Sequence, residues 1–205
     1  MATAKLVPIT VKRTVRRKSA NSRRTRRREH LTPPEIEQLL KRARKNRWAA
    51  RDHALVLVTY SHALRLSEAL QTRWDDFDLK HGVFHVRRLK GSIGGDHPLR
   101  GREIRALRQL KREGPTNSDF VFVSERGGQL TARGVQKMLE RLAEACGLGK
   151  LAIHPHMLRH SCGYYMVDRG EDLRVIQAYL GHANIQHTVR YTFLSPRKFR
   201  RLWDD

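Results

Sequence analysis

Hydrophobic residues first recur at helical spacing from Leu31 onward. The motif Thr-Pro-Pro-Glu at 32–35 has the form of a capping box with prolines in the first turn, and Leu31 can form a hydrophobic staple with Ile36. The apolar stripe of a first helix follows, formed by Ile36, Leu39, Leu40 and Ala43. The pattern then predicts a second helix over about 50–64 and a shorter third helix over about 67–73.

The middle of the chain has the short apolar runs of strands. Val83–Val86 is followed by a polar turn region at 91–96 and a second extended segment at 97–99. The run Phe-Val-Phe-Val at 120–123 predicts a further strand. Helices are predicted around Ile104, Leu107 and Leu110, from a cap at Thr131 to Ala145 with a stop at Gly147, and from His156 onward with stops at Gly170 and Gly181. We therefore predict one mainly α domain over 31–205, with a small antiparallel β-sheet.

Charge changes this picture at the N-terminus. The chain has 42 Lys and Arg against 20 Asp and Glu, a net charge of +22. Residues 1–28 hold eleven of these bases and no acid, and the remainder still has a net charge of +11. We predict that residues 1–30 form a disordered basic arm and that the partner is a polyanion, with nucleic acid ahead of an anionic membrane surface. A solubilising tail is the alternative for the arm.

Composition also excludes several classes of protein. No stretch approaches eighteen apolar residues, and the N-terminus has no continuous apolar segment, so we predict neither a membrane span nor a secretory signal. The two cysteines, Cys146 and Cys162, are too few for a disulfide framework and suit a reducing compartment. The prediction is a cytoplasmic protein without a membrane partner.

The densest cluster of reactive side chains spans residues 154–160, His-Pro-His-Met-Leu-Arg-His. On a helix, His156, Arg159 and His160 share one face. Two histidines four residues apart with Cys162 nearby could bind zinc, but Arg159 between them would repel a cation. Imidazoles beside a guanidinium suit a phosphate better. Packing and capping histidines remain the alternative, and we predict no metal.

Two further segments carry candidate side chains. Arg65 lies in an apolar stretch and therefore needs an anion, which could be the nearby Glu68 or a ligand. Leu180-Gly181-His182 ends a predicted helix, and Tyr191 follows nine residues after His182. A helix cap and an interfacial aromatic residue are the plain alternatives for these two.

Taken together, these segments resemble one family. Arg-Leu-Ser-Glu at 65–68, His-Met-Leu-Arg-His at 156–160, Leu-Gly-His at 180–182 and Tyr-Thr at 191–192 stand in the order and spacing of the tyrosine recombinases, the phage-integrase-like enzymes. The resemblance covers about residues 31–203. The segments at 154–162, 179–182 and 187–189 look closest to the short recombinases that invert the fimbrial promoter switch.

The resemblance implies a role for each matching residue. Arg65 and Arg159 match the arginines that clamp the scissile phosphate, and Tyr191 matches the nucleophile that forms a 3′-phosphotyrosine. Glu68 matches the acid that orients its neighbours. The remaining matches are the two histidines, His156 and His182, and the general acid of a hairpin, Lys90. For the arm we expect phosphate contacts from Arg16, Arg17, Arg23, Arg24, Arg26, Arg27 and Arg28.

The resemblance also implies partners and chemistry. It implies site-specific cleavage and rejoining of double-stranded DNA without metal, ATP or other cofactor, by a homo-tetramer assembled on DNA from monomers, with DNA-bending accessory proteins as candidate helpers. Typical members carry a DNA-clamping domain before the catalytic domain, whereas a basic segment of about thirty residues precedes Leu31 here, as in the fimbrial-switch enzymes. A tail helix with Phe199, Leu202 and Trp203 could dock on a neighbouring copy or on its own domain.

Two other functions fit the same residues. A transcription regulator of this fold would bind DNA without cutting it, and would form no covalent adduct. A type IB topoisomerase would use the same chemistry as a monomer, and would relax plasmids that lack any special site.

Overall fold

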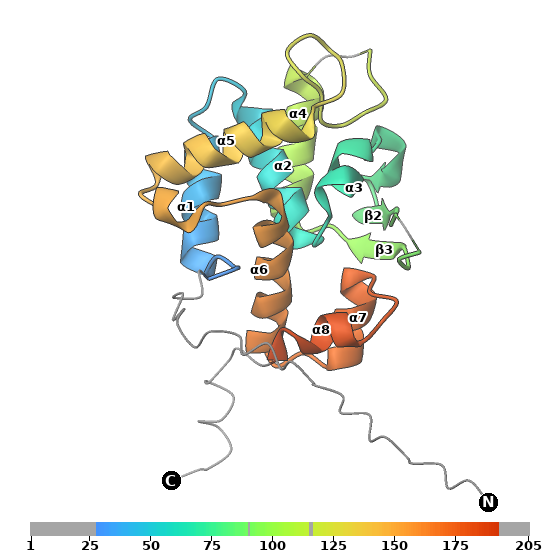
Figure 1. The fold of residues 1–205 in the computed structure, drawn as a ribbon. Coiled ribbons are helices and arrows are strands. Elements are labelled where there is room, and N and C mark those ends of the chain that lie inside the picture. Colours follow the sequence, from blue (N-terminus) through green and yellow to red (C-terminus); the bar gives the residue numbers. More distant parts are fainter. Residues whose placement is uncertain (1–27, 90, 115–116, 193–205) are drawn as a thin grey trace, which may run out of the picture.

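The computed structural model describes residues 28–89, 91–114 and 117–192. Over these residues the chain is mainly helical, with one small antiparallel sheet at its side (Figure 1). The predicted fold class is confirmed. Lys90, residues 1–27 of the predicted arm and the predicted tail helix with Phe199, Leu202 and Trp203 lie outside the described residues.

Helix α1 (Pro33–Ala43) begins as the sequence predicts. The carboxylate of Glu35 accepts hydrogen bonds from the backbone N–H and the hydroxyl of Thr32, at 2.7 and 2.9 Å. Leu31 and Ile36 are both buried beside this cap. The N–H of Leu31 also donates to the hydroxyl of Ser161 at 2.7 Å, so the start of α1 is fixed to a distant part of the chain.

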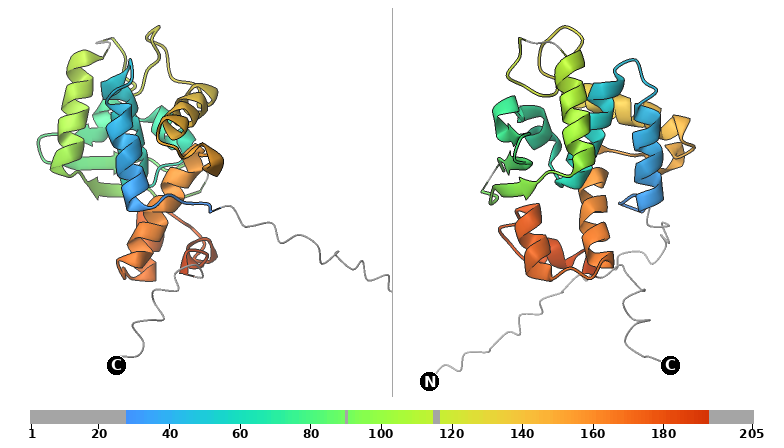
Figure 2. Two further views of the ribbon diagram at one scale, coloured as in Figure 1. Left: turned by 90° about the vertical axis from the view of Figure 1, so that its left-hand side faces the viewer. Right: turned by 180° about the vertical axis from the view of Figure 1, so that it is seen from behind.

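Helix α2 (Ala49–Ser61) is the central element of the core, and α1, α4 and α6 pack against it (Figures 1 and 2). Residues 54–58 are apolar and buried, as in a helix that has neighbours on every side. The prediction carried this helix on to residue 64, which is wrong. Ala63 has φ +50°, and a residue in the left-handed region cannot continue a right-handed helix.

The sheet follows two short helices, α3 (Leu66–Gln71) and the 3₁₀ turn η1 (Trp74–Asp76). Its antiparallel strands lie in the order β1 (Phe77–Asp78), β2 (Val83–Val86) and β3 (Gly95–Pro98). Phe84 of β2 pairs with Phe77 on one side and with His97 on the other. Helix α4 (Gly101–Glu113) then packs along α2 with Ala106, Leu107 and Leu110 buried.

The rest of the described chain is helical. Thr131 accepts a bond from the N–H of Gly134 at 3.1 Å and caps α5 (Ala132–Ala145), as predicted. The turn η2 (Gly149–Leu151) leads into α6 (Pro155–Asp168), and α7 (Leu173–Leu180) and α8 (Gln186–Val189) lie beside the last turns of α6 (Figure 1). The predicted stop at Gly181 is confirmed, because this residue has φ +67°.

One predicted strand is wrong. Residues 120–123 form two isolated bridges, Arg73 to Phe120 and Val123 to Gln129, and no ladder. Val121, Phe122 and Val123 are nevertheless all buried. These residues are apolar because they belong to a loop that packs into the core, and not because they pair with a neighbouring strand. None of the helices in the described part of the chain is long and apolar enough to cross a membrane.

Candidate active site

Arg159 is held by backbone groups at the ends of two other helices. It lies on α6 and is 1% exposed. Its guanidinium donates to the carbonyl of Ala63, just after α2, and at 2.7 Å to the carbonyl of Leu180, the last residue of α7. Because a guanidinium is planar, these two bonds fix the direction of its other N–H groups.

The carboxylate of Glu68 joins three arginines. It accepts hydrogen bonds from Nη1 of Arg65 at 2.6 Å and from Nη1 of Arg88 at 2.8 Å, and it lies 4.0 Å from Nη1 of Arg159. Burial raises the pKa of Glu68, but the backbone hydrogen bond from Arg65 and the charge of Arg88 outweigh this effect and hold the pKa below its usual value. Three positive charges therefore face one negative charge, and the excess suits an anion.

Arg88 is a site residue that the sequence analysis missed. Its guanidinium is buried, and besides Glu68 it bonds the carbonyls of Ala63 at 3.1 Å, His62 at 3.0 Å and Tyr179 at 2.8 Å. The sequence did hold a signal. Alternate residues of β2, Phe84 and Val86, point into the core, and position 88 continues this period of two.

Two of the predicted residues lie at the rim of this cluster. Arg65 caps the start of α3, and a third of its side chain is exposed. His156 lies in the first turn of α6 and is exposed. Partial burial and the nearby charge of Arg159 lower the pKa of His156, which favours the uncharged imidazole. Both side chains are accessible to a ligand that the inner arginines would bind.

Tyr191 follows α8 and is 1% exposed. Its hydroxyl lies 2.9 Å from Nδ1 of His160, and its ring packs edge-on against Tyr164. Burial raises the pKa of Tyr191 to about 12, although the charges of Arg159 and Arg190 act in the opposite direction. The sequence analysis considered His160 as a zinc ligand, a phosphate ligand or a packing histidine, so its contact with the tyrosine is new.

His182 lies directly after the left-handed Gly181. Its Nδ1 is 2.8 Å from the hydroxyl of Thr188, and its ring is parallel to that of Tyr191 at 6.3 Å. Burial and the charge of Arg159 lower the pKa of His182 to about 3. Ring contacts thus connect His156, His160, Tyr191 and His182 in one row.

The alternative zinc site finds no support among the described residues, which contain no group of three potential ligands. His160 contacts the tyrosine, and the thiol of Cys162 contacts the carbonyl of Ser61 at 3.8 Å, away from the histidines. Burial raises the pKa of Cys162 to about 12, which disfavours the thiolate that binds metals.

Two groups of predicted site residues are incompletely seen. Lys90 lies outside the described residues, as do Arg16, Arg17, Arg23, Arg24, Arg26 and Arg27 of the arm. Arg28 is described, and its guanidinium contacts the carboxylate of Glu35 at 2.5 Å. This ion pair attaches Arg28 to α1, so it has a structural partner that the sequence analysis did not predict.

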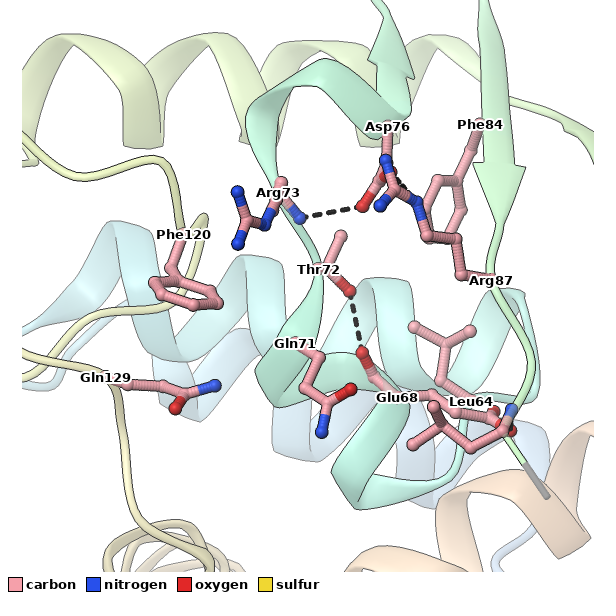
Figure 3. Close-up of a pocket in the computed structure, with 11 residues that line it drawn as sticks. Leu64, Glu68, Gln71, Thr72, Arg73, Asp76, Phe84, Arg87, Phe120 and Gln129 are labelled. Carbon is pink, nitrogen blue, oxygen red and sulfur yellow. Dashed lines mark hydrogen bonds and ion pairs between the residues drawn. The ribbon is translucent and has the colours of Figure 1, made fainter.

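A hollow of about 420 Å³ lies between α3, the end of β2 and the loop that contains Phe120 and Gln129 (Figure 3). It shares Glu68 with the arginine cluster but is not lined by any other residue of the predicted site. The arginines beside it already have acidic partners: Arg87 contacts Asp76 at 2.6 Å, and Arg73 contacts Asp119 at 3.5 Å. The candidate site is therefore the arginine cluster with Tyr191, and not this hollow.

Comparison with known proteins agrees with this geometry. The Phage integrase family matches residues 29–197. The chain belongs to this family. FimE of Escherichia coli K12, a type 1 fimbriae regulatory protein, is 38% identical over 182 residues, which cover 86% of this chain and 91% of FimE. FimB of the same strain is 39% identical over 188 residues, covering 90% of this chain and 94% of FimB.

A solved structure extends the comparison. The XerH site-specific recombinase bound to its difH substrate superposes with a TM-score of 0.72 and 26% sequence identity, over 86% of this chain and 54% of XerH. The chain thus spans about half the length of XerH. With the family match and the fimbrial relatives, this likeness identifies the integrase-family protein as a tyrosine-type site-specific recombinase.

Proposed function

We propose that this recombinase cleaves and rejoins double-stranded DNA through a 3′-phosphotyrosine on Tyr191, and inverts or integrates a DNA segment. The observation that carries the proposal is the cluster of Arg65, Arg88 and Arg159 around Glu68, which has excess positive charge. The charge of Arg159 acts on Tyr191 and opposes the rise of its pKa. Similarity to FimE and FimB over most of both chains favours inversion of a segment that controls fimbriae.

Each proposed step has a matching side chain. Arg65 and Arg159 bind the non-bridging oxygens of the phosphate and stabilise the charge of the transition state. Tyr191 loses its proton with the assistance of His156 or His182, attacks phosphorus and forms the covalent intermediate, while Lys90 protonates the departing 5′ oxygen. His156 and His182 donate hydrogen bonds to the phosphate. Glu68 keeps the arginines in place.

The covalent intermediate makes external energy unnecessary. A phosphotyrosine retains the free energy of the phosphodiester that was cut, so a 5′ hydroxyl of the partner strand can attack it directly. Arginine, histidine and lysine provide the positive charge that a metal would otherwise supply. The reaction therefore runs without ATP and without a metal ion.

The partners follow from the same chemistry. Four copies assemble on two specific DNA sites, from monomers in solution, with DNA-bending accessory proteins as helpers. The XerH structure, a recombinase bound to its DNA substrate, supports a DNA partner. The basic arm over residues 1–30 neutralises DNA phosphates ahead of a catalytic domain over 31–205. We place the protein in the cytoplasm, on the nucleoid.

The proposal is tested with nicked duplexes that carry candidate sites from the neighbourhood of the gene, namely any inverted repeats there. We expect the wild-type protein to form a covalent adduct that survives denaturing gels, and Tyr191→Phe to form none while its DNA binding remains, because only one hydroxyl is lost. We also expect that EDTA does not change the yield of the adduct. An adduct formed by Tyr191→Phe would refute the nucleophile, and rapid relaxation of plasmids without these repeats would favour a topoisomerase.

A further inference from the structure

One face of α6 forms a slot for the ring of Tyr191. His160, Gly163 and Tyr164 lie three and four residues apart and therefore on the same side of the helix. A Cβ atom on Gly163 would lie 3.0 Å from the ring of Tyr191, closer than ordinary carbon contacts allow. Alanine at this position would force the ring of Tyr191 to shift by a few tenths of an ångström, and Tyr164 closes the slot edge-on at 5.1 Å.

The hydroxyl of Tyr191 has one described partner in this slot, Nδ1 of His160 at 2.9 Å. Burial and the charges of His156 and Arg190 lower the pKa of His160 to about 3, so its imidazole is neutral at physiological pH. A neutral imidazole with its proton on Nε2 accepts a hydrogen bond at Nδ1. We assign the imidazole proton to Nε2, and in this tautomer the tyrosine hydroxyl donates to the histidine.

We propose that His160 and Gly163 position Tyr191 for attack: His160 orients the hydroxyl, and Gly163 provides the space that lets the ring lie against α6. This inference rests on the proposed role of Tyr191 as the nucleophile. Arg159 precedes His160 on α6. One helix therefore positions both the phosphate-binding arginine and, through His160, the tyrosine.

These contacts indicate that His160 positions the hydroxyl of Tyr191 and does not take up its proton. The pKa values of Tyr191 and His160, about 12 and about 3, leave the proton on the tyrosine. His160 is also 6% exposed, so the low-dielectric surroundings disfavour an imidazolium at this place. A neutral hydrogen-bond acceptor is then sufficient for the role.

Two substitutions of His160 separate these functions. His160→Asn places an amide oxygen near the position of Nδ1 and keeps an acceptor that cannot take up a proton, whereas His160→Phe keeps an aromatic ring without an acceptor. We expect single-turnover cleavage of the nicked duplexes to fall about a hundredfold in His160→Phe, the scale of a misplaced reacting group. His160→Asn should stay within about tenfold of wild type.

Gly163→Ala tests the slot independently. Alanine favours a helix interior more than glycine does, so the change does not weaken α6 itself. Its methyl group should displace the ring by a few tenths of an ångström and lower cleavage about tenfold, with DNA binding unchanged. The matched control for His160→Phe is His154→Phe, which replaces an exposed histidine at the N-cap of α6 by the same residue. His154→Phe should cleave as the wild type does.

A measurement without DNA keeps the inference separate from the proposed function. In ¹⁵N spectra of the histidine side chains, the Nδ1 signal assigned to His160 should shift when Tyr191→Phe removes the donor. An unchanged signal would overturn the inference, as would wild-type cleavage by His160→Phe or a defect in His160→Asn as large as that in His160→Phe. A wild-type protein that forms no adduct would instead refute the proposed function alone.

Discussion

The inner wall and the rim of the site differ in how they are held. Arg88, Arg159 and Glu68 form the inner wall, their side chains are 1% exposed, and backbone carbonyls or each other occupy their polar groups. Arg65 and His156 form the rim, where Arg65 is a third exposed and His156 is exposed. The fold thus builds the inner wall before DNA arrives, while the rim can still adjust to the phosphate.

The strongest test of this comparison is Arg159→Lys. Lysine keeps the charge but has no planar fork, so it cannot satisfy the carbonyls of Ala63 and Leu180 and also reach a phosphate. We expect cleavage of the nicked duplexes to fall at least about a hundredfold, the scale of one lost transition-state donor. Single-turnover adduct formation measures it, and near-normal cleavage would make Arg159 a structural residue only.

Arg88→Lys tests whether the inner wall also supports the fold. Lysine has too few donors for Glu68 and three carbonyls, and each buried acceptor left without a partner costs about 1–3 kcal/mol. We expect the melting temperature to fall by about 2–10 °C. Cleavage should fall about tenfold, since the carboxylate of Glu68 and the carbonyl of Ala63 also hold Arg159.

The neighbouring arginine is the control for Arg88. Arg87 contacts Asp76, but two thirds of its side chain is exposed. Arg87→Lys should change the melting temperature by about 1 °C or less, because lysine keeps the charge opposite the buried carboxylate of Asp76 and the side chain at position 87 is mostly exposed. Equal effects at the two positions would remove the distinction between a buried wall and an exposed surface.

The smallest effect on chemistry is expected from the arm, which belongs to neither the wall nor the rim. Deleting residues 1–27 keeps the ion pair of Arg28 with Glu35. If about four charges of the arm engage phosphates, the slope of log affinity against log salt falls by roughly 3 to 4. Cleavage in a saturated complex should not change. Salt titrations on target and scrambled duplexes measure this, and an unchanged slope would show that the arm does not bind DNA.

Sequence motifs were sufficient to find the candidate residues, but the residues that they contact could be found only from the structure. Arg65, Arg159 and Tyr191 could be picked from the sequence because each stands in a short motif with a fixed spacing. His160 could not be assigned to Tyr191, because the contact joins residues 31 positions apart and depends on how α8 returns to α6. Helix and cap patterns were largely correct since they depend on local sequence, as at Thr32 and Thr131.

The errors have physical reasons as well. Residues 120–123 were predicted as a strand because a buried loop and a buried strand can have the same run of apolar residues. The end of α2 was predicted three residues late because nothing in an alanine marks a positive φ. Arg88 was overlooked because it stands next to Arg87 in the sequence. Only Arg88 is buried, and the charge of the two residues does not distinguish them.

The bonds of Arg159 have a consequence during biosynthesis. Its guanidinium needs the carbonyl of Ala63, 96 positions earlier in the chain, and that of Leu180, 21 positions later. Chains emerge from the ribosome N-terminus first, so α1, α2 and the sheet exist before either bond can form. The candidate site is complete only after α7 and α8 have been made and docked, so a growing polypeptide does not yet hold it.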